Sequence, residues 1–130
     1  MQSNLLVGSS CTFLIPSLYA YRKRHYFYSS ILTGTAICSI NHWRRPENGF
    51  RRMIDIIYAS FSFSVFSVLG VLSIRHKWYG YTGLFAIVYC YKMSHHLYQT
   101  KGPESNWYIY HLLFHLLMTT ELMMIIRVVS

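Results

Sequence analysis

Long apolar runs, separated by short basic connections, most limit how this chain can fold. Five such runs follow one another, and the twelve lysines and arginines gather in the short connections and at the ends of the runs. Basic residues at helix ends are typical of anchors that face anionic headgroups in a membrane. The pattern predicts an all-α fold, an integral membrane bundle of about five transmembrane helices.

The five runs give the expected helices. The second and fourth are short, close to the lower limit for crossing roughly 30 Å of hydrocarbon. A cleaved signal peptide is the alternative for the first run, but no basic region precedes it. We expect a single transmembrane domain over residues 1–130, in a multi-pass protein that lies in an endomembrane if the organism is eukaryotic. The runs are Leu5–Tyr21, Tyr26–His42, Met53–Ile74, Tyr79–Met93 and Trp107 to the C-terminus.

Composition argues against an ordinary soluble domain. Of 130 residues, 53% are hydrophobic and 18% aromatic, and only 12% are charged. A net charge of +8 would suggest nucleic acid in a soluble protein, but cations placed between apolar runs suit a membrane surface better. The three cysteines fall inside apolar runs without a pairing rhythm, which argues against a disulfide framework. Membrane lipid and other membrane proteins are the expected partners, and nucleic acid is not.

Polar residues concentrate where the second run ends and the third begins. Asp55 enters the third run almost at once, among apolar neighbours. An ionisable residue inside an apolar span is costly in hydrocarbon and indicates a partner and a function. Just before it, four polar side chains follow helical spacing and share one stripe of the second helix: Thr35, Cys38, Ser39 and His42.

A second polar group lies far along the chain. His111 and His115 are four residues apart, one helical turn, so both imidazoles face the same side of the last helix. If the chain crosses the membrane five times, the second helix ends, and the third and fifth begin, on one side. Counting crossings therefore places His42, Asp55 and the histidine pair at the same end of the bundle.

This convergence predicts a metal site. Three protein ligands and an open position make the catalytic form of a Zn²⁺ centre, and we predict His42, His111 and His115 as the ligands. Asp55 would act as a general base or orient a ligand histidine. Ser39, one turn before His42, would hydrogen-bond the water or a substrate oxyanion. Packing at an interface is the alternative interpretation of the histidine pair.

The same residues resemble a known family. A serine-containing segment ending in histidine, an aspartate early in the next helix and an HxxxH in the last helix correspond here to CSINH (38–42), Asp55 and HLLFH (111–115). This arrangement resembles the alkaline ceramidase, adiponectin-receptor and hemolysin III superfamily, often called CREST. The resemblance implies a multi-helix membrane fold with Zn²⁺ held by three histidines and a water, acting on lipid amides such as ceramides.

The chain departs from that family in two respects. Family members generally have seven helices, whereas five are expected here, which would make this a shortened divergent member. The family serine usually lies four residues before its histidine; here Cys38 holds that position and Ser39 follows it.

The leading hypothesis is therefore a zinc-dependent membrane hydrolase of lipid amides. A non-catalytic small membrane subunit or assembly protein of a larger complex is the alternative, since the chain is short, basic and rich in aromatic residues. A haem-binding bundle ranks third, because histidines at helix ends can supply axial ligands but Asp55 then has no role.

Overall fold

The chain is all-helical in a computed structural model that describes residues 2–45, 49–73, 78–102 and 104–129, which confirms the all-α part of the predicted fold class. Within these residues the bends and turns between helices are short. There are six helices in this part of the chain: α1 (Gln2–Cys11), α2 (Leu14–Arg22), α3 (Tyr26–Arg44), α4 (Phe50–Ser73), α5 (Trp78–Lys101) and α6 (Trp107–Val129).

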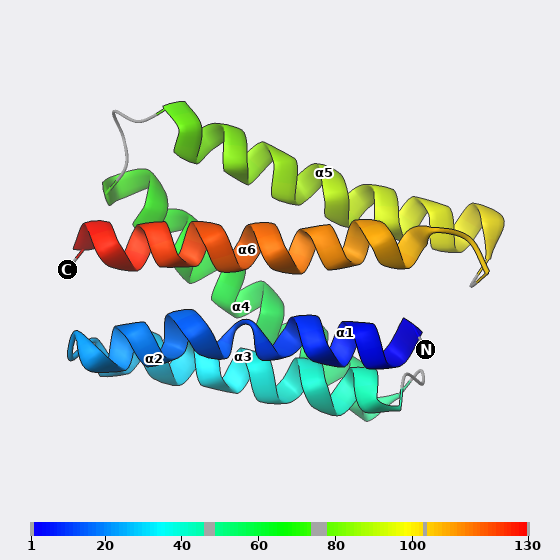
Figure 1. The fold of residues 1–130 in the computed structure, drawn as a ribbon, viewed down its shortest axis with the longest axis horizontal. Coiled ribbons are helices and arrows are strands. Elements are labelled where there is room, and N and C mark those ends of the chain that lie inside the picture. The colour runs from blue at the N-terminus through cyan, green and yellow to red at the C-terminus, as the bar shows by residue number, and fades with distance from the viewer. Residues whose placement is uncertain (1, 46–48, 74–77, 103, 130) are drawn as a thin grey trace.

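The helices run back and forth along one long axis (Figure 1). α1 and α2 follow one another in line and pack against α3, α6 lies beside them, and α5 packs on the other side of α6. α4 crosses obliquely from the end of α3 to the start of α5. As a result α3 ends, and α4 and α6 begin, at the same end of the bundle, as counting crossings predicted.

The first predicted helix, Leu5–Tyr21, is broken into α1 and α2, which corrects the expectation of one continuous helix. Proline at position 16 lacks an amide hydrogen, and its ring clashes with the carbonyl four residues earlier, at Thr12. The helix accordingly stops at Cys11, and tighter bonds bridge the break, from the Thr12 amide to the Ser9 carbonyl and from the Phe13 amide to the Ser10 carbonyl.

The fourth helix is longer than predicted. The sequence pattern placed its end at Met93, but α5 continues to Lys101. Gly102 stops it, with φ of 80° and its amide donating to the Tyr98 carbonyl, an arrangement that glycine adopts without a steric penalty. The third helix begins at Phe50, three residues before its predicted start, and its predicted last residue, Ile74, lies outside the described residues.

Close packing joins α3 to α4. A Cβ on Gly34 would overlap the outer end of the Tyr58 ring, so glycine at this position makes room for the tyrosine of α4, in line with the close packing that the sequence suggested. Around this contact lies one apolar core cluster contributed by four helices, α2, α3, α4 and α6, together with Phe13 between α1 and α2. Its buried members are Phe13, Ala20, Ile31, Leu32, Ala36, Phe66, Leu122, Ile125 and Ile126.

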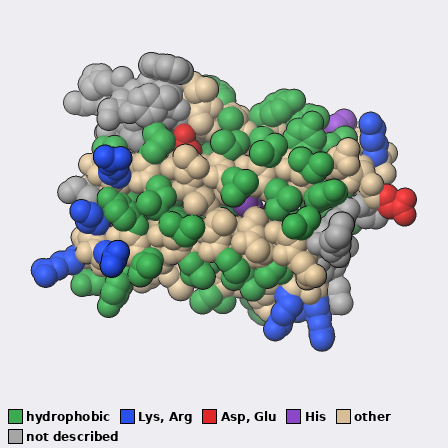
Figure 2. Space-filling model, viewed as in Figure 1, with side chains coloured by type: hydrophobic (Ala, Val, Ile, Leu, Met, Phe, Trp, Pro, Cys, Tyr) green, Lys and Arg blue, Asp and Glu red, His purple; other side chains and the backbone are tan. Residues whose placement is uncertain are grey.

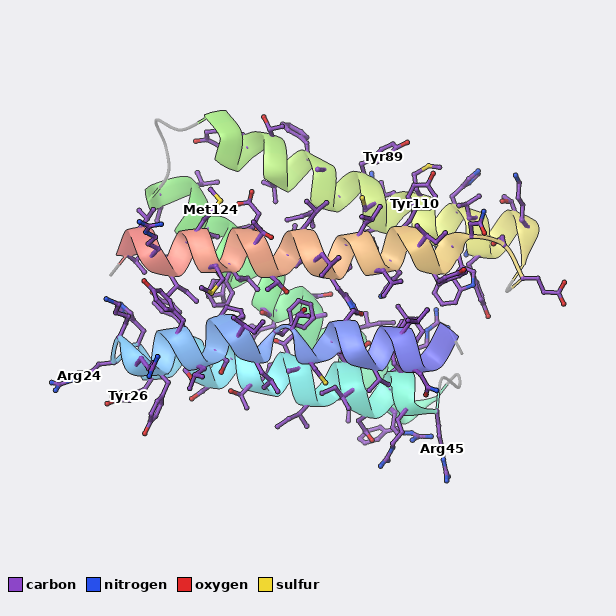
Figure 3. All side chains as sticks on the ribbon, in the orientation of Figure 1. Arg24, Tyr26, Arg45, Tyr89, Tyr110 and Met124 are labelled. Carbon is purple, nitrogen blue, oxygen red and sulfur yellow. The ribbon has the colours of Figure 1, made fainter. Side chains whose placement is uncertain are left out.

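The outside of the bundle is apolar between two charged ends. Lysine and arginine side chains gather at the two ends, and hydrophobic side chains cover much of the surface between them (Figure 2). Arg24 and Arg45 project from opposite ends (Figure 3). Two of the described helices are long and apolar enough to cross a membrane, Phe50–Leu72 and Trp107–Val129, each of 23 residues with mean hydropathy 1.8.

Candidate functional site

A single large cavity contains every residue that the sequence predicted for the site. It has a volume of about 1150 Å³ and is lined by residues of α1, α3, α4, α5 and α6, together with Phe13 between α1 and α2. Its lining includes Ser39 and His42 from α3, Asp55 from α4, and His111 and His115 from α6. Side chains separated by up to 76 positions in the sequence therefore share one internal space.

The histidine pair faces this cavity. The ring centroids of His111 and His115 lie 4.7 Å apart, as expected for residues one turn apart on a helix. Trp43 links the pair to α3: its ring centroid lies 5.0 Å from that of His111 and 4.6 Å from that of His42.

His42 is buried with a polar atom that has no partner. Only 6% of its surface is exposed, and Nδ1 is the one buried side-chain nitrogen or oxygen in the described residues without a hydrogen bond. An unsatisfied buried polar group costs about 1–3 kcal/mol, so native proteins keep few of them and often for function. The unpaired nitrogen is an available ligand atom beside the histidine pair.

His115 is held by a serine of α1. Ser9 Oγ donates to the Leu6 carbonyl at 3.0 Å and lies 2.7 Å from His115 Nδ1. A hydroxyl has one hydrogen: where Ser9 gives it to Leu6, its oxygen accepts from Nδ1–H of His115. The neutral ring then carries its lone pair on Nε2, the tautomer that a metal needs.

Ser39 has a similar partner on α1. Ser10 Oγ lies 2.8 Å from the Leu6 carbonyl and 2.7 Å from Ser39 Oγ, and either serine of that pair can be the donor of the second bond. Ser39 lines the cavity and is 97% buried. Its expected bond to a water or an oxyanion stays a prediction.

The predicted metal ligands line the same cavity but do not surround a common point. Among the residues that the structure describes, no three histidine, cysteine, aspartate or glutamate side chains are close enough to hold one ion in these conformations. The donor types nevertheless suit Zn²⁺: an unpaired nitrogen on His42, an available Nε2 on His115, and His111 between them. His111 Nδ1 has only a long contact, 3.5 Å to Ser94 Oγ.

Four residues of the site escaped sequence reasoning. Ser9, Ser10, Trp43 and Ser94 either hold or contact the predicted residues. The two α1 serines carry a weak signal, because paired hydroxyls in an apolar run require partners in lipid. Nothing in the sequence indicates which helix supplies those partners.

Other candidate groups lie apart from the predicted ligands. His95 lines the cavity from α5, whereas the neighbouring His96 is exposed and is not part of the lining. Glu121 borders a separate small cavity of about 50 Å³, packed so closely on α5 that a Cβ at Gly83 would overlap its carboxylate. Comparison of the chain with family models, curated proteins and solved structures found no match.

Proposed function

We propose that the protein is a zinc-dependent membrane hydrolase that cleaves lipid amides, as a shortened divergent member of the CREST superfamily. One observation carries the proposal: three histidines and an aspartate from three helices line one cavity, and one of the histidines keeps an unpaired nitrogen at 6% exposure. A purely structural cavity would not require these four side chains together.

We propose a multi-pass membrane location with five crossings, α1 and α2 together forming the first. Two helices have the necessary length and apolarity, and only 11% and 28% of the residues in their most apolar stretches are buried. The core helix of a soluble protein would be mostly buried, so this exposure favours contact with lipid. The short α3, with 19 residues, meets the minimum length for a crossing.

The proposed ligands are His42, His111 and His115. When bound, zinc supplies a Lewis acid and lowers the pKa of its bound water to about 7. Ser9 orients His115 by accepting its Nδ1 hydrogen, and Trp43 packs against the other two rings. The apolar lining excludes bulk water, which strengthens each polar interaction in the cavity.

Asp55 is the proposed general base. In amide hydrolysis the water oxygen bonds to the acyl carbon, the carbon–nitrogen bond breaks, and the amine nitrogen takes a proton. A carboxylate in the cavity receives the proton from water and returns it to the leaving amine. The products are a fatty acid and a free amine.

Elemental analysis tests the proposal. Protein purified in detergent should hold about one zinc per chain, and the double variant His111→Ala, His115→Ala should lose it. The matched control is His25→Ala, His96→Ala, which removes two histidines outside the cavity and should keep the metal. Absence of zinc in the wild type, or equal zinc in both double variants, would contradict the proposal.

The second candidate is a non-catalytic membrane subunit. It is favoured by a stripe of large exposed side chains along one face of α4, at a spacing that suits a partner helix: Ile57, Phe61, Val68 and Leu72. A subunit would copurify with a partner and keep its function when the three predicted ligands are replaced by alanine. The zinc measurement separates the two functions.

A further inference from the structure

The large cavity extends along α6 and changes in polarity as it does so. Its lining follows one face of the helix, at His111, His115, Met118 and Leu122. Between positions 111 and 122 an α-helix rises by about 16 Å. The cavity therefore has a polar end at the histidines and an apolar end at Leu122.

The lining of α4 and α5 changes in the same direction. On α4 it passes from Asp55 to Phe63, away from the start of the helix. α5 runs opposite to α4 and α6 (Figure 1), and its lining passes from His95 back to Ile87. Phe63 and Ile87 thus lie towards the apolar end, together with the end of the α6 stripe.

The apolar end is closed, and a second cavity lies behind it. Ile87 and Leu122 are buried, whereas the exposed lining residues of α5 fall between positions 91 and 98, at the polar end. The small cavity of about 50 Å³ shares four lining residues with the large one. We call these four side chains the apolar partition: Phe63, Ile87, Met118 and Leu122.

The distance from the histidines to the partition suits a chain of limited length. From His115 to Leu122 the helix rises by about 10 Å. A fully extended polypeptide advances about 3.6 Å for every three backbone bonds, so an extended carbon chain advances about 1.2 Å per bond. An acyl chain of about ten carbons, with its carbonyl carbon beside the histidines, therefore reaches the partition.

We propose that the protein selects lipid amides with acyl chains of about ten carbons, and that Met118 sets this limit. The proposal rests on the proposed function, which places the carbonyl carbon at the histidines. Met118 is half-buried and borders both cavities, whereas Leu122 is also a buried member of the core cluster, where truncation would cost stability.

Replacing Met118 by alanine removes its thioether and terminal methyl and joins the two cavities. A cavity needs about 10–15 Å³ in this measure for each water-sized group, so the small cavity adds room for about three or four such groups. A methylene is of similar size. The variant should therefore accept acyl chains about four carbons longer than the wild type does.

Binding is measured without metal and without turnover. Chelator-treated protein in nanodiscs is titrated with N-octanoyl, N-decanoyl, N-myristoyl and N-palmitoyl ethanolamine, in competition with tritiated N-decanoyl ethanolamine and at equal mole fractions in the bilayer. Chains within the limit should bind about equally, because they exchange one apolar environment for another. The N-palmitoyl lipid should bind about tenfold more weakly, because extra methylenes crowd a closed apolar space.

Variants assign the limit to Met118. Met118→Ala should bind the N-myristoyl lipid as tightly as the N-decanoyl lipid, and its binding of the latter shows that it is folded. Met118→Leu conserves volume and should keep the wild-type limit. Adding Ser67→Leu to Met118→Ala refills the small cavity and should restore it. Met124→Ala, at a methionine that lines neither cavity, is the matched control and should change nothing.

Three results would overturn this inference: equal binding of all four lipids by the wild type, an unchanged limit in Met118→Ala, or a shifted limit in Met124→Ala. Absence of zinc with an intact length limit would refute the hydrolase alone. Zinc and hydrolysis without a length limit would refute only the role of the apolar partition.

Discussion

The two halves of the bundle are built differently. Around the core cluster, apolar side chains of four helices and Phe13 fill the space, and the neighbouring cavity measures only about 50 Å³. At the other end, where α3 ends and α6 begins, a cavity of about 1150 Å³ is lined by histidines, serines and an aspartate. We refer to these as the packed half and the cavity half.

Polar groups show the same contrast. In the packed half, Ser17 and Ser29 bond to each other's carbonyls across α2 and α3, at 3.0 and 2.9 Å, so each hydroxyl is satisfied. In the cavity half, His42 keeps a buried nitrogen without a partner. Functional sites often break local rules that the rest of a fold obeys, so the unsatisfied nitrogen makes the cavity half the candidate site.

The largest expected effect is a difference in stability between alanine variants at two buried leucines. Leu32, fully buried in the packed half, should cost about 2–5 kcal/mol of unfolding free energy when changed to alanine. Leu6, 1% exposed but lining the large cavity, should cost about half as much, because one side already lacks neighbours. Denaturant titration in micelles measures both, with the exposed Leu116→Ala as control. Equal losses of unfolding free energy in the Leu32 and Leu6 variants would show that the cavity half is packed as tightly as the packed half.

Alanine variants at two glycines test the close packing of α3 against α4. Gly34→Ala should lower the unfolding free energy by about 1–3 kcal/mol, since the added methyl overlaps the Tyr58 ring. Gly8→Ala is the matched control: no atom lies within 4 Å of the added Cβ, and alanine favours a helix by about 1 kcal/mol. The same titration measures both. A neutral Gly34→Ala would mean that the two helices separate easily.

Sequence reasoning brought the residues of the candidate site together because helical spacing and the counting of helices are rules that need only the sequence. The four-residue interval of His111 and His115 fixes a shared helix face, and the alternating directions of successive helices bring the end of α3 and the starts of α4 and α6 to one end of the bundle. Neither rule needs tertiary information. The cavity lining includes these two histidines together with His42 and Asp55.

The remaining features depend on neighbours that no local rule identifies. Ser9 contacts His115 across 106 positions, and the contact follows from how the broken first helix lies beside α6. The break itself was predictable from Pro16 but was missed, because an apolar run of that length suits one span. The end of α5 was missed because residues 94–101 are polar enough to resemble a loop.

Within the cavity half, a smaller effect is expected on zinc affinity when Ser9 is replaced. If zinc binds as proposed, Ser9→Ala should weaken its affinity by about tenfold, because His115 loses the acceptor that fixes its tautomer. Competition with a chromophoric chelator gives the affinity. Ser30→Ala, an exposed serine bonded only to the Tyr26 carbonyl of its own helix, should leave it unchanged. An equal affinity in both variants would mean that Ser9 serves packing alone.

The smallest expected effect is a gain in unfolding free energy rather than a loss. His42→Phe removes a buried nitrogen without a partner and keeps an aromatic ring beside Trp43, so the metal-free protein should gain about 1 kcal/mol of unfolding free energy. The same variant should lose zinc, and His96→Phe, at an exposed position, should change neither property. Chelator-treated samples compared by denaturant titration give the sign. Stabilisation together with loss of metal would mark His42 as a residue kept for function, whereas destabilisation would place it with the packed half.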